Sequence, residues 1–295
     1  MIINRLADGL KAFETFVPLI YKSFVSLIKV ILISDLRVKI PATQERTCFV
    51  LGNGPSLQES LREYDQLFHK YDLFSVNHFA AAEEYVHYQP GSYVLLDPGF
   101  FIESAQNDSR VNETIDKIVS ETKWSMYLYI PRSAKGWSKI KYLKTNKNIQ
   151  IVFFNYTIVN GFDPLSFFLY RRNLGFPVCQ NVLGASILLA LNIGYQEIFL
   201  FGADHSWIKD LRVNEDNELY LTHRHFYSAV IPTKHVKISD PVKNTPVTLG
   251  QFFVSCFKVF DVYYVLERYA KHRKSRISNA SDGSFIDAFE RRKPK

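Results

Sequence analysis

Small polar residues and glycines follow several apolar runs of this chain, at positions where they could bind a nucleotide. The first set lies in the stretch T-C-F-V-L-G-N-G-P-S-L and comprises Gly52, Asn53, Gly54 and Ser56. Glycine turns let a ligand approach the backbone closely, and a helix that starts there points free N–H groups at the ligand. Phosphate is the usual ligand of such a turn, and a plain strand-to-helix connection is the alternative. The spacing fits neither a Walker A loop nor the complete G-x-G-x-x-G fingerprint.

Asn and Asp residues recur within three positions of the ends of apolar runs. They are Asn53, Asn77, Asp97, Asn155 and Asp204. A single residue of this kind after a strand is ordinarily a turn residue that satisfies its own backbone. Because ligands of parallel sheets bind beyond the carboxyl ends of the strands, the whole set predicts a hydrogen-bonding site at one edge of a sheet.

The stretch Asn181–Asp204 supplies a second set of candidate binding residues. Gly184 and Ser186 lie near the start of an apolar helix whose small residues suit close approach by a ligand. The run that follows the helix delivers Gly202 and Asp204 to the same edge of the sheet. Tight packing of the helix is the alternative reason for its small residues.

Histidines gather after this stretch, and one of them could act as a general base. They are His205, His223, His225 and His235. No cysteine or carboxylate at the expected spacing completes a zinc site with them, so a titratable imidazole is the more economical interpretation. The acidic run Glu215–Glu218 could bind a divalent cation, although a solvated loop or lid is the commoner explanation.

The elements that must position these residues alternate along the chain from residue 46. Buried strands are predicted at Cys48–Leu51, Leu73–Val76, Tyr93–Leu96, Met126–Ile130, Ile151–Phe154, Ile198–Phe201 and Arg276–Ser278. Helices are predicted at Leu57–Phe68, Glu113–Glu121, Ala185–Asn192 and Leu249–Tyr269. This alternation predicts right-handed βαβ units, and so an α/β fold with a mostly parallel, Rossmann-like sheet covered by helices on both faces.

Residues 1–40 form a separate segment with an amphipathic helix. Within Phe16–Ile33, Lys22, Ser26 and Lys29 share one helical face and leave a wide apolar face. Two lysines argue against a membrane span, so we expect the helix to lie on an anionic membrane surface. A homo-oligomer contact, or packing on the main domain, is the alternative. Residues 46–290 then form the catalytic domain, with a lid at about 205–235, and the basic tail Arg291–Lys295 is expected to be disordered or membrane-facing.

Composition narrows the class of protein. Of the 295 residues, 47% are hydrophobic and 22% charged, which is typical of a globular chain with a sizeable core. A net charge of +7 favours nucleotides, anionic glycans or an anionic membrane as partners. Nucleic acid is not expected, because no zinc-finger, RNP or recognition-helix pattern is present. Three scattered cysteines and the lack of a cleavable signal predict a cytoplasmic protein, peripheral to the inner membrane face if the first helix binds lipid.

Three motifs together resemble a family. They are L-G-N-G-P-S-L, V-N-H-F, and the G-A-S…A-L-N-I-G-Y-Q-E-I-F-L-F-G-A-D segment. They are similar to motifs of bacterial CMP-sialic-acid-dependent sialyltransferases of the Campylobacter type, of the related MptE-like 6-hydroxymethylpterin diphosphokinases, and of the central domain of Maf flagellin glycosyltransferases. The likeness covers roughly residues 46–290.

The resemblance implies a GT-A-like domain that binds a CMP-sugar across the strand ends. Its motifs would place Asn53, Gly54 and Ser56 at the phosphate and ribose, Asn77 at the cytidine, and Asp97 at the sugar. Ser186 would lie near the substrate-binding turn, and Gly202 and Asp204 match the family's G-x-D. By order along the chain, His225 matches the family's catalytic base, with His235 second.

The chain departs from the sialyltransferases at two places. Asn181 stands where they carry an Arg before the small-residue turn. Ser206 and Trp207 stand where they place a phosphate-stabilising Tyr, for which Tyr220 or Tyr227 could substitute.

The function implied is an inverting glycosyltransferase that moves a CMP-activated acidic sugar, sialic-acid-like or Kdo-like, to a cell-surface or lipid-linked glycan. His225 would deprotonate the acceptor, amides of the Gly52–Ser56 turn would stabilise the departing phosphate, and Asp204 would orient a substrate. Neither a metal nor a cofactor is expected. One alternative is an ATP- and Mg²⁺-dependent pterin diphosphokinase with Asp97, Asp204 or Glu215–Glu218 as metal ligands. Another is a non-catalytic nucleotide-binding subunit of a membrane assembly.

Overall fold

The computed structural model describes residues 2–102, 108–222, 226, 235–237 and 245–295, with only the backbone described at 2–12, 15, 222 and 235–237. Eight strands form the central sheet in the order β11-β10-β6-β1-β2-β3-β4-β5. Their bounds are β1 Thr47–Leu51, β2 Asp72–Val76, β3 Ser92–Val94, β4 Met126–Pro131, β5 Ile149–Phe154, β6 Glu197–Phe201, β10 Arg276–Asn279 and β11 Glu290–Arg291. All neighbouring strands pair in parallel, which confirms the predicted α/β fold class.

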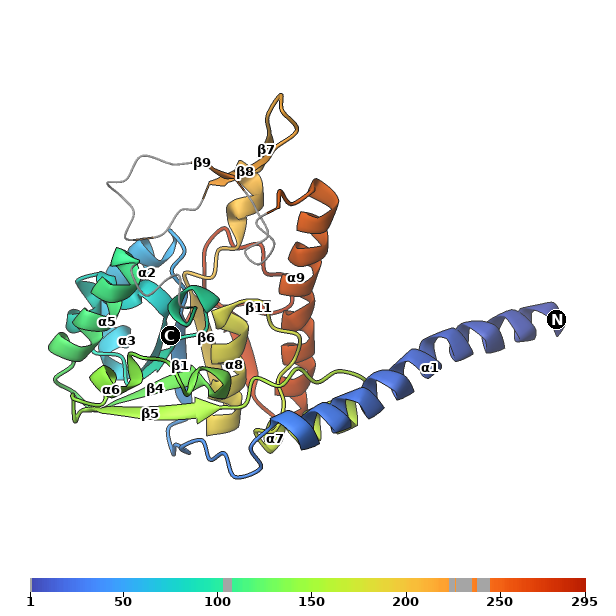
Figure 1. Ribbon diagram of the computed structural model, residues 1–295, viewed down its shortest axis with the longest axis horizontal. Helices are drawn as coiled ribbons and strands as arrows, with labels where there is room; N and C mark the ends of the chain where they lie inside the picture. Colours follow the sequence, from blue (N-terminus) through green and yellow to red (C-terminus); the bar gives the residue numbers. More distant parts are fainter. Residues whose placement is uncertain (1, 103–107, 223–225, 227–234, 238–244) are drawn as a thin grey trace.

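Helices cover both faces of this sheet (Figure 1). They are α1 Ile2–Ile33, α2 Leu57–Glu63, α3 Asp65–Lys70, α4 Glu84–Tyr88, α5 Ser109–Glu121, α6 Ile140–Leu143, α7 Asp163–Arg171, α8 Val182–Ile193 and α9 Leu249–His272. The predicted helix Leu57–Phe68 is in fact two helices, because the backbone of Tyr64 leaves helical geometry between α2 and α3.

The alternation of side chains along β1 divides the core between the two faces. Cys48 and Val50 pack with α7, α8 and α9, whereas Phe49 and Leu51 pack with α2 to α6. All four side chains have an exposed fraction of 0%, as expected for a strand in a doubly covered parallel sheet.

The helix α1 extends away from the body at its N-terminal end and docks from Phe16 onward, where the Phe16 ring packs on Phe162 (Figure 1). Ser23 Oγ accepts a hydrogen bond from the backbone N–H of Phe162 at 3.0 Å, and Ser26 Oγ donates to the Asn160 carbonyl at 2.8 Å. Val30 is buried in the core. By length and composition alone, two helical stretches in the described chain could cross a membrane, Phe16–Ile33 and Leu249–His272.

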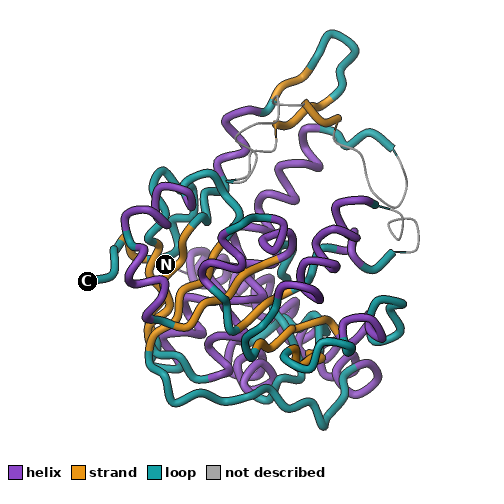
Figure 2. Tube along the Cα trace, turned by 90° about the vertical axis from the view of Figure 1, so that its left-hand side faces the viewer, coloured by secondary structure: helices purple, strands orange, loops and turns teal. Residues whose placement is uncertain are grey.

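A small antiparallel sheet stands over one end of the main sheet (Figures 1 and 2). It contains β7 Arg212–Val213, β8 Leu219–Thr222 and β9 His235–Lys237 in that order. Leu219 and Leu221 pack on Phe252 and Cys256 of α9, so this sheet has its own small apolar cluster. It occupies the part of the sequence where a lid is expected.

The basic C-terminal segment differs from the prediction of a disordered or membrane-facing tail. Glu290 and Arg291 form β11, which pairs with β10 at the edge of the sheet. Arg291 donates to the carbonyl oxygens of Ser281, Ser284 and Ile286. The charges of this tail therefore satisfy backbone acceptors of a neighbouring loop.

Candidate functional site

The order of the strands places a crevice between β1 and β6. The chain runs outward from β1 through β2 to β5, then returns to the other side of β1 as β6. Ligands of such sheets bind beyond the carboxyl ends of the strands at this reversal. A cavity of about 430 Å³ opens there, and Asn53, Gly54, Asn77, Gly202 and Asp204 all lie in its lining. The sequence thus predicted these five lining residues.

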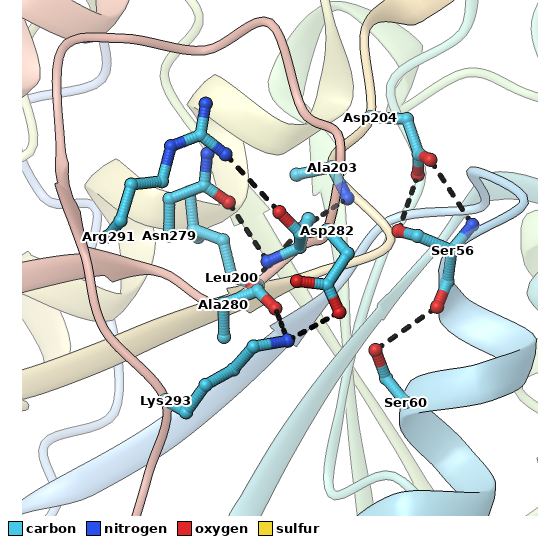
Figure 3. A network of polar contacts seen from close by, with 11 residues as sticks. Ser56, Ser60, Leu200, Ala203, Asp204, Asn279, Ala280, Asp282, Arg291 and Lys293 are labelled. Carbon is cyan, nitrogen blue, oxygen red and sulfur yellow. Dashed lines mark hydrogen bonds and ion pairs between the residues drawn. The ribbon is translucent and has the colours of Figure 1, made fainter.

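Asp204 is held at the first turn of α2 by both polar groups of Ser56 (Figure 3). Ser56 Oγ donates to Asp204 Oδ2 at 2.9 Å, and the Ser56 backbone N–H donates to Oδ1 at 3.2 Å. Burial of the carboxyl raises its pKa, and the bonds from Ser56 partly oppose that shift. The carboxylate itself therefore occupies the helix N-terminus where a substrate phosphate was expected.

Two further amides of the glycine turn are engaged as well. The N–H of Gly52 donates to the Phe201 carbonyl at 2.7 Å, and that of Gly54 to the Gly202 carbonyl at 2.9 Å. The expectation that amides of this turn stabilise a departing phosphate is therefore wrong for Gly52, Gly54 and Ser56 in this conformation. The turn uses these groups to join the ends of β1 and β6.

Close backbone packing explains why glycines are required at this turn. A Cβ atom on Gly52 would lie 2.4 Å from the Gly202 carbonyl oxygen, and one on Gly54 would lie 2.0 Å from Asp204 Oδ2. Gly202 also has a positive φ of 61°, a conformation that side chains disfavour. The glycines bring two strand ends and Asp204 together, rather than opening space for a ligand.

A hydrogen-bonded loop braces Asp204 from the opposite side (Figure 3). Ser281 Oγ accepts from the Ala203 N–H at 2.8 Å, and Ser284 Oγ donates to the Ala203 carbonyl at 2.6 Å. Lys293 Nζ donates a hydrogen bond to the Ala280 carbonyl at 2.8 Å. Both backbone groups of the residue before Asp204 are thus fixed by the C-terminal segment. Sequence reasoning did not identify this brace.

Two asparagines fix the rim between the first three strands. Asn53 Nδ2 donates to the Val76 carbonyl at 3.2 Å, and Asn77 Oδ1 accepts from the Leu96 N–H at 3.2 Å. Asn53 Oδ1 is buried without a partner, although it belongs to a cavity-lining residue. A buried, unpaired acceptor of this kind is costly unless a ligand or water binds it.

Asn181 is the N-cap of α8 and supplies a second unpaired group. Its Oδ1 accepts from the Gly184 N–H at 2.8 Å and from the Tyr263 hydroxyl at 3.2 Å. These two donors fix the orientation of the amide, so that Nδ2 is a buried donor without a partner. Asn181, Val182 and Leu183 all line the cavity, so the N-terminus of α8 faces it.

His205 completes a chain of polar contacts with Asn181. Its Nε2 lies 2.7 Å from the Tyr263 hydroxyl, and because that hydroxyl donates to Asn181, the imidazole N–H is the donor to Tyr263. Burial lowers the pKa of His205 to about 4 and raises that of Tyr263 well above its ordinary value. A neutral imidazole with so low a pKa positions its neighbours and is poorly matched to general-base chemistry at neutral pH. The position of His205 directly after Asp204 is the signal in the sequence that points to this positioning role.

The remaining wall of the cavity contains two aromatic rings beside Leu221, Cys256 and Val259. Trp207 packs edge-on against Phe252, with ring centroids 5.8 Å apart, and both residues line the cavity. Among the described lining residues the charged side chains are Asp204 and Asp210, and none is a Lys or Arg. This wall suits a planar or apolar part of a ligand.

Seven predicted binding residues do not lie in the lining, and two of them, Gly52 and Ser56, belong to the glycine turn described above. Asn155 binds backbone groups of Asp35 and Asn173, and Asp97 caps its own turn by accepting from the Gly99 N–H. Gly184 and Ser186 are packed inside, where Ser186 donates to the Val182 carbonyl, and Tyr220 donates to Glu218.

Two of the predicted residues, His225 and Tyr227, lie outside the described residues. His235 lies in β9, whose backbone is described without its side chain. Phe226, which follows His225 in the sequence, is described: its N–H donates to the Asn53 carbonyl at 3.1 Å and its ring packs on Phe79.

The carboxylates proposed for the kinase alternative are not brought together. In the described part of the chain, the cluster of potential metal ligands is Asp65, His69 and His87, which contains neither Asp97 nor Asp204. Glu218 instead accepts from Tyr220.

No protein-family model matches the chain, and no curated protein matches it in sequence. Among solved structures it is similar to a Maf glycosyltransferase from Magnetospirillum magneticum AMB-1, at 12% identity and a TM-score of 0.49, over 90% of this chain and 37% of that one. A UDP-glucose 4-epimerase from Thermotoga maritima, solved with UDP-glucose, aligns at 10% identity and a TM-score of 0.25, over 79% of this chain and 54% of the epimerase. This chain therefore spans less than two thirds of either protein.

Proposed function

We propose that the protein is an inverting glycosyltransferase that takes its sugar from a CMP-activated acidic donor. The observation that carries the proposal is the cavity at the strand reversal, whose lining residues include Asn53 and Asn181, each with one buried amide atom that has no partner. One acceptor and one donor, fixed on two separate elements, can bind the polar edge of a nucleotide. The motif L-G-N-G-P-S-L around Asn53 supports the same assignment, whereas Asn181 stands where the sialyltransferases carry an Arg.

The donor phosphate is proposed to bind at the N-terminus of α8. Amides at a helix N-terminus and the positive end of the helix dipole favour an anion. Asn181 Nδ2 adds a side-chain donor at the same end of α8, and Val182 and Leu183 lie beside it in the cavity wall. This position avoids the first turn of α2, which Asp204 already fills.

The catalytic base is proposed to be His225, with His235 as the second candidate. It would accept the proton of the acceptor hydroxyl as that oxygen attacks the anomeric carbon and CMP departs from it. Phe226, the residue after His225 in the sequence, donates its N–H to the Asn53 carbonyl at the rim. Asp204 and His205 then act as positioning residues, through Ser56 and through Tyr263 respectively.

The first test is a thermal-shift measurement with CMP, CDP, UDP and ATP, each with and without Mg²⁺. A ligand at 100 times its Kd stabilises the folded state by about 2.7 kcal/mol. We expect CMP to raise the melting midpoint with or without metal. Stabilisation by ATP only, and only with Mg²⁺, would replace the transferase by the kinase.

Two variants connect the response to the site. Asn181→Asp keeps the helix cap, since Asp caps well, but replaces the unpaired N–H donor with a carboxylate oxygen. We expect it to lose the response to CMP, while Asn217→Asp, which adds the same charge at an exposed turn, keeps it. His225→Ala should abolish CMP release from a CMP-sugar in the presence of acceptor. Unchanged release would remove His225 from the mechanism.

We also propose that α1 binds an anionic membrane surface, where a lipid-linked acceptor would be concentrated. Phe16, Ile20, Phe24 and Ile31 share one face and have exposed fractions of 55%, 49%, 62% and 75%. Lys22 and Lys29 are exposed as well, but they lie on the other side of the helix, next to the docked Ser26. A helix with a wide exposed apolar face and lysines on the remaining surface is typical of the membrane interface.

Sedimentation with vesicles tests this membrane proposal. We expect the wild-type chain to pellet with anionic vesicles, and the double variant Phe24→Glu, Ile31→Glu to remain in solution. Phe168→Glu, which changes an exposed Phe on α7, is the matched control and should pellet like the wild type. A dimer that depends on Phe24 and Ile31, without vesicle binding, would assign the apolar face to a second copy instead.

A further inference from the structure

Three metal-ligating side chains meet on the face of the sheet that carries α3 and α4. Asp65 and His69 are four residues apart on α3, a spacing that puts them on one side of the helix. His87 reaches them from α4. One ligand atom from each lies within 4.8 Å of the other two.

Two of the three distances among these atoms match the edge of a tetrahedral coordination sphere, and the third is about 0.4 Å longer. His87 Nε2 lies 3.4 Å from His69 Nε2 and 3.4 Å from Asp65 Oδ1, and His69 Nε2 lies 3.8 Å from the same oxygen. A tetrahedral ion with bonds of about 2.0–2.1 Å separates its ligand atoms by about 3.3–3.4 Å. The two Nε2 atoms are further apart than in an ordinary hydrogen bond, which spans about 2.9–3.0 Å.

The carboxylate at this cluster is also oriented as a ligand would need. The Tyr88 hydroxyl lies 2.9 Å from Asp65 Oδ1 and helps to fix the position of the carboxylate. A hydrogen-bond partner that fixes a ligand carboxylate is a common feature of metal sites. Oδ2 adds a second oxygen to the same group.

The surroundings admit a cation from solvent. The side chains of His69, His87 and Asp65 have exposed fractions of 44%, 58% and 48%. Asp65 and His87 border a groove that is also lined by Glu83 and Glu84, whose negative charges outnumber the single positive charge of Arg62 in the same lining. This groove is separate from the strand-reversal cavity, because the two have no lining residue in common.

We infer that Asp65, His69 and His87 form a binding site for a divalent transition-metal ion, with Zn²⁺ as the best fit. Two imidazole nitrogens and one carboxylate oxygen suit Zn²⁺ and leave a fourth position for water. The ion would join α3 to α4, which precede β2 and β3 respectively. It would therefore stabilise the fold from outside the cavity, whether or not the proposed transferase function is correct.

The test is a Zn²⁺ titration of the full chain after treatment with a chelator. We expect the wild type to bind one more equivalent than His69→Gln or His87→Gln. His272→Gln, which alters an exposed histidine at the end of α9, is the matched control and should bind as the wild type does. Zn²⁺ bound by other histidines is the same in every variant, so the difference in bound equivalents reports this site alone.

Two further measurements make the result decisive. Co²⁺ should give the wild type a visible absorption band typical of tetrahedral coordination that His87→Gln lacks, and Asp65→Asn should weaken Zn²⁺ binding by at least about tenfold. Zn²⁺ should also raise the melting midpoint of the wild type and His272→Gln but not of His87→Gln, while the midpoints without metal agree. Equal stoichiometry, absorption and midpoint shift in the wild type and His87→Gln would refute the site.

Discussion

Replacing Ser56 by alanine removes the hydroxyl that donates to the buried Asp204 carboxylate at 2.9 Å. Asp204 has an exposed fraction of 7%, so water only partly replaces the lost donor. A hydrogen bond to a charged group contributes about 1.5–3 kcal/mol. Because the Ser56 N–H still binds Oδ1, we expect a loss of about 2 kcal/mol in the free energy of unfolding at neutral pH.

The loss should depend on pH in a definite direction. The folded pKa of Asp204 is raised above its ordinary value, so the folded state binds this proton more tightly than the unfolded state does. Its contribution to stability is present at low pH and is lost as pH rises through the folded pKa. Removing the Ser56 hydroxyl raises that pKa further. The cost of the substitution should therefore be larger at pH 7.5 than at pH 4.5.

Thermal unfolding at the two pH values measures this effect. A loss of about 2 kcal/mol corresponds to a melting midpoint lower by roughly 4–8 °C for a domain of this size. Ser60→Ala is the matched control, because Ser60 Oγ binds only the neutral Ser56 carbonyl one turn further along α2 (Figure 3). Equal losses in the two variants, or a Ser56→Ala loss that does not change with pH, would refute the reasoning about Asp204.

Three further changes test the brace and the buried groups. Gly54→Ala should lower the melting midpoint markedly, because its Cβ would lie 2.6 Å from the Gly202 carbonyl oxygen; a wild-type midpoint would show that the turn can widen. Burial lowers the pKa of His205 to about 4, so unfolding between pH 6.5 and 4 takes up a proton and the melting midpoint falls as the pH is lowered. His205→Asn should make this fall smaller; an unchanged slope would assign the fall to other groups. Arg291→Ala should lower the midpoint by leaving the Ser281 and Ser284 carbonyls without this donor, and circular dichroism at matched temperatures would show whether the sheet itself is retained.

The sequence predicted the architecture because apolar runs and turn residues are local signals. The run Cys48–Leu51 is one strand, Thr47–Leu51, within one residue of its predicted start. Asn53, Asn77 and Asp204 meet at the rim because all follow strands of one parallel sheet. The rule that ligands bind beyond the carboxyl ends of parallel strands requires only the positions and directions of the strands, and the pattern of apolar runs predicts both.

The partners of each polar group could not be predicted in the same way. Asn155 also follows a strand, but its strand is β5 at the sheet edge, where it binds the segment after α1. The Ser56 amide was expected to face a phosphate, yet a carboxylate 148 residues away takes that place. Contacts between distant segments depend on packing that no local pattern encodes.

The brace on Asp204 has a consequence for the order of events during synthesis. Residues 203 and 204 leave the ribosome well before residues 281–293, which hold them. At about 5–20 residues per second this interval lasts roughly 5–20 s. Throughout it, the edge of β6 that later pairs with β10 has open backbone groups, which are a template for pairing with other chains. Assembly of the site is therefore completed only when β10 pairs with this edge.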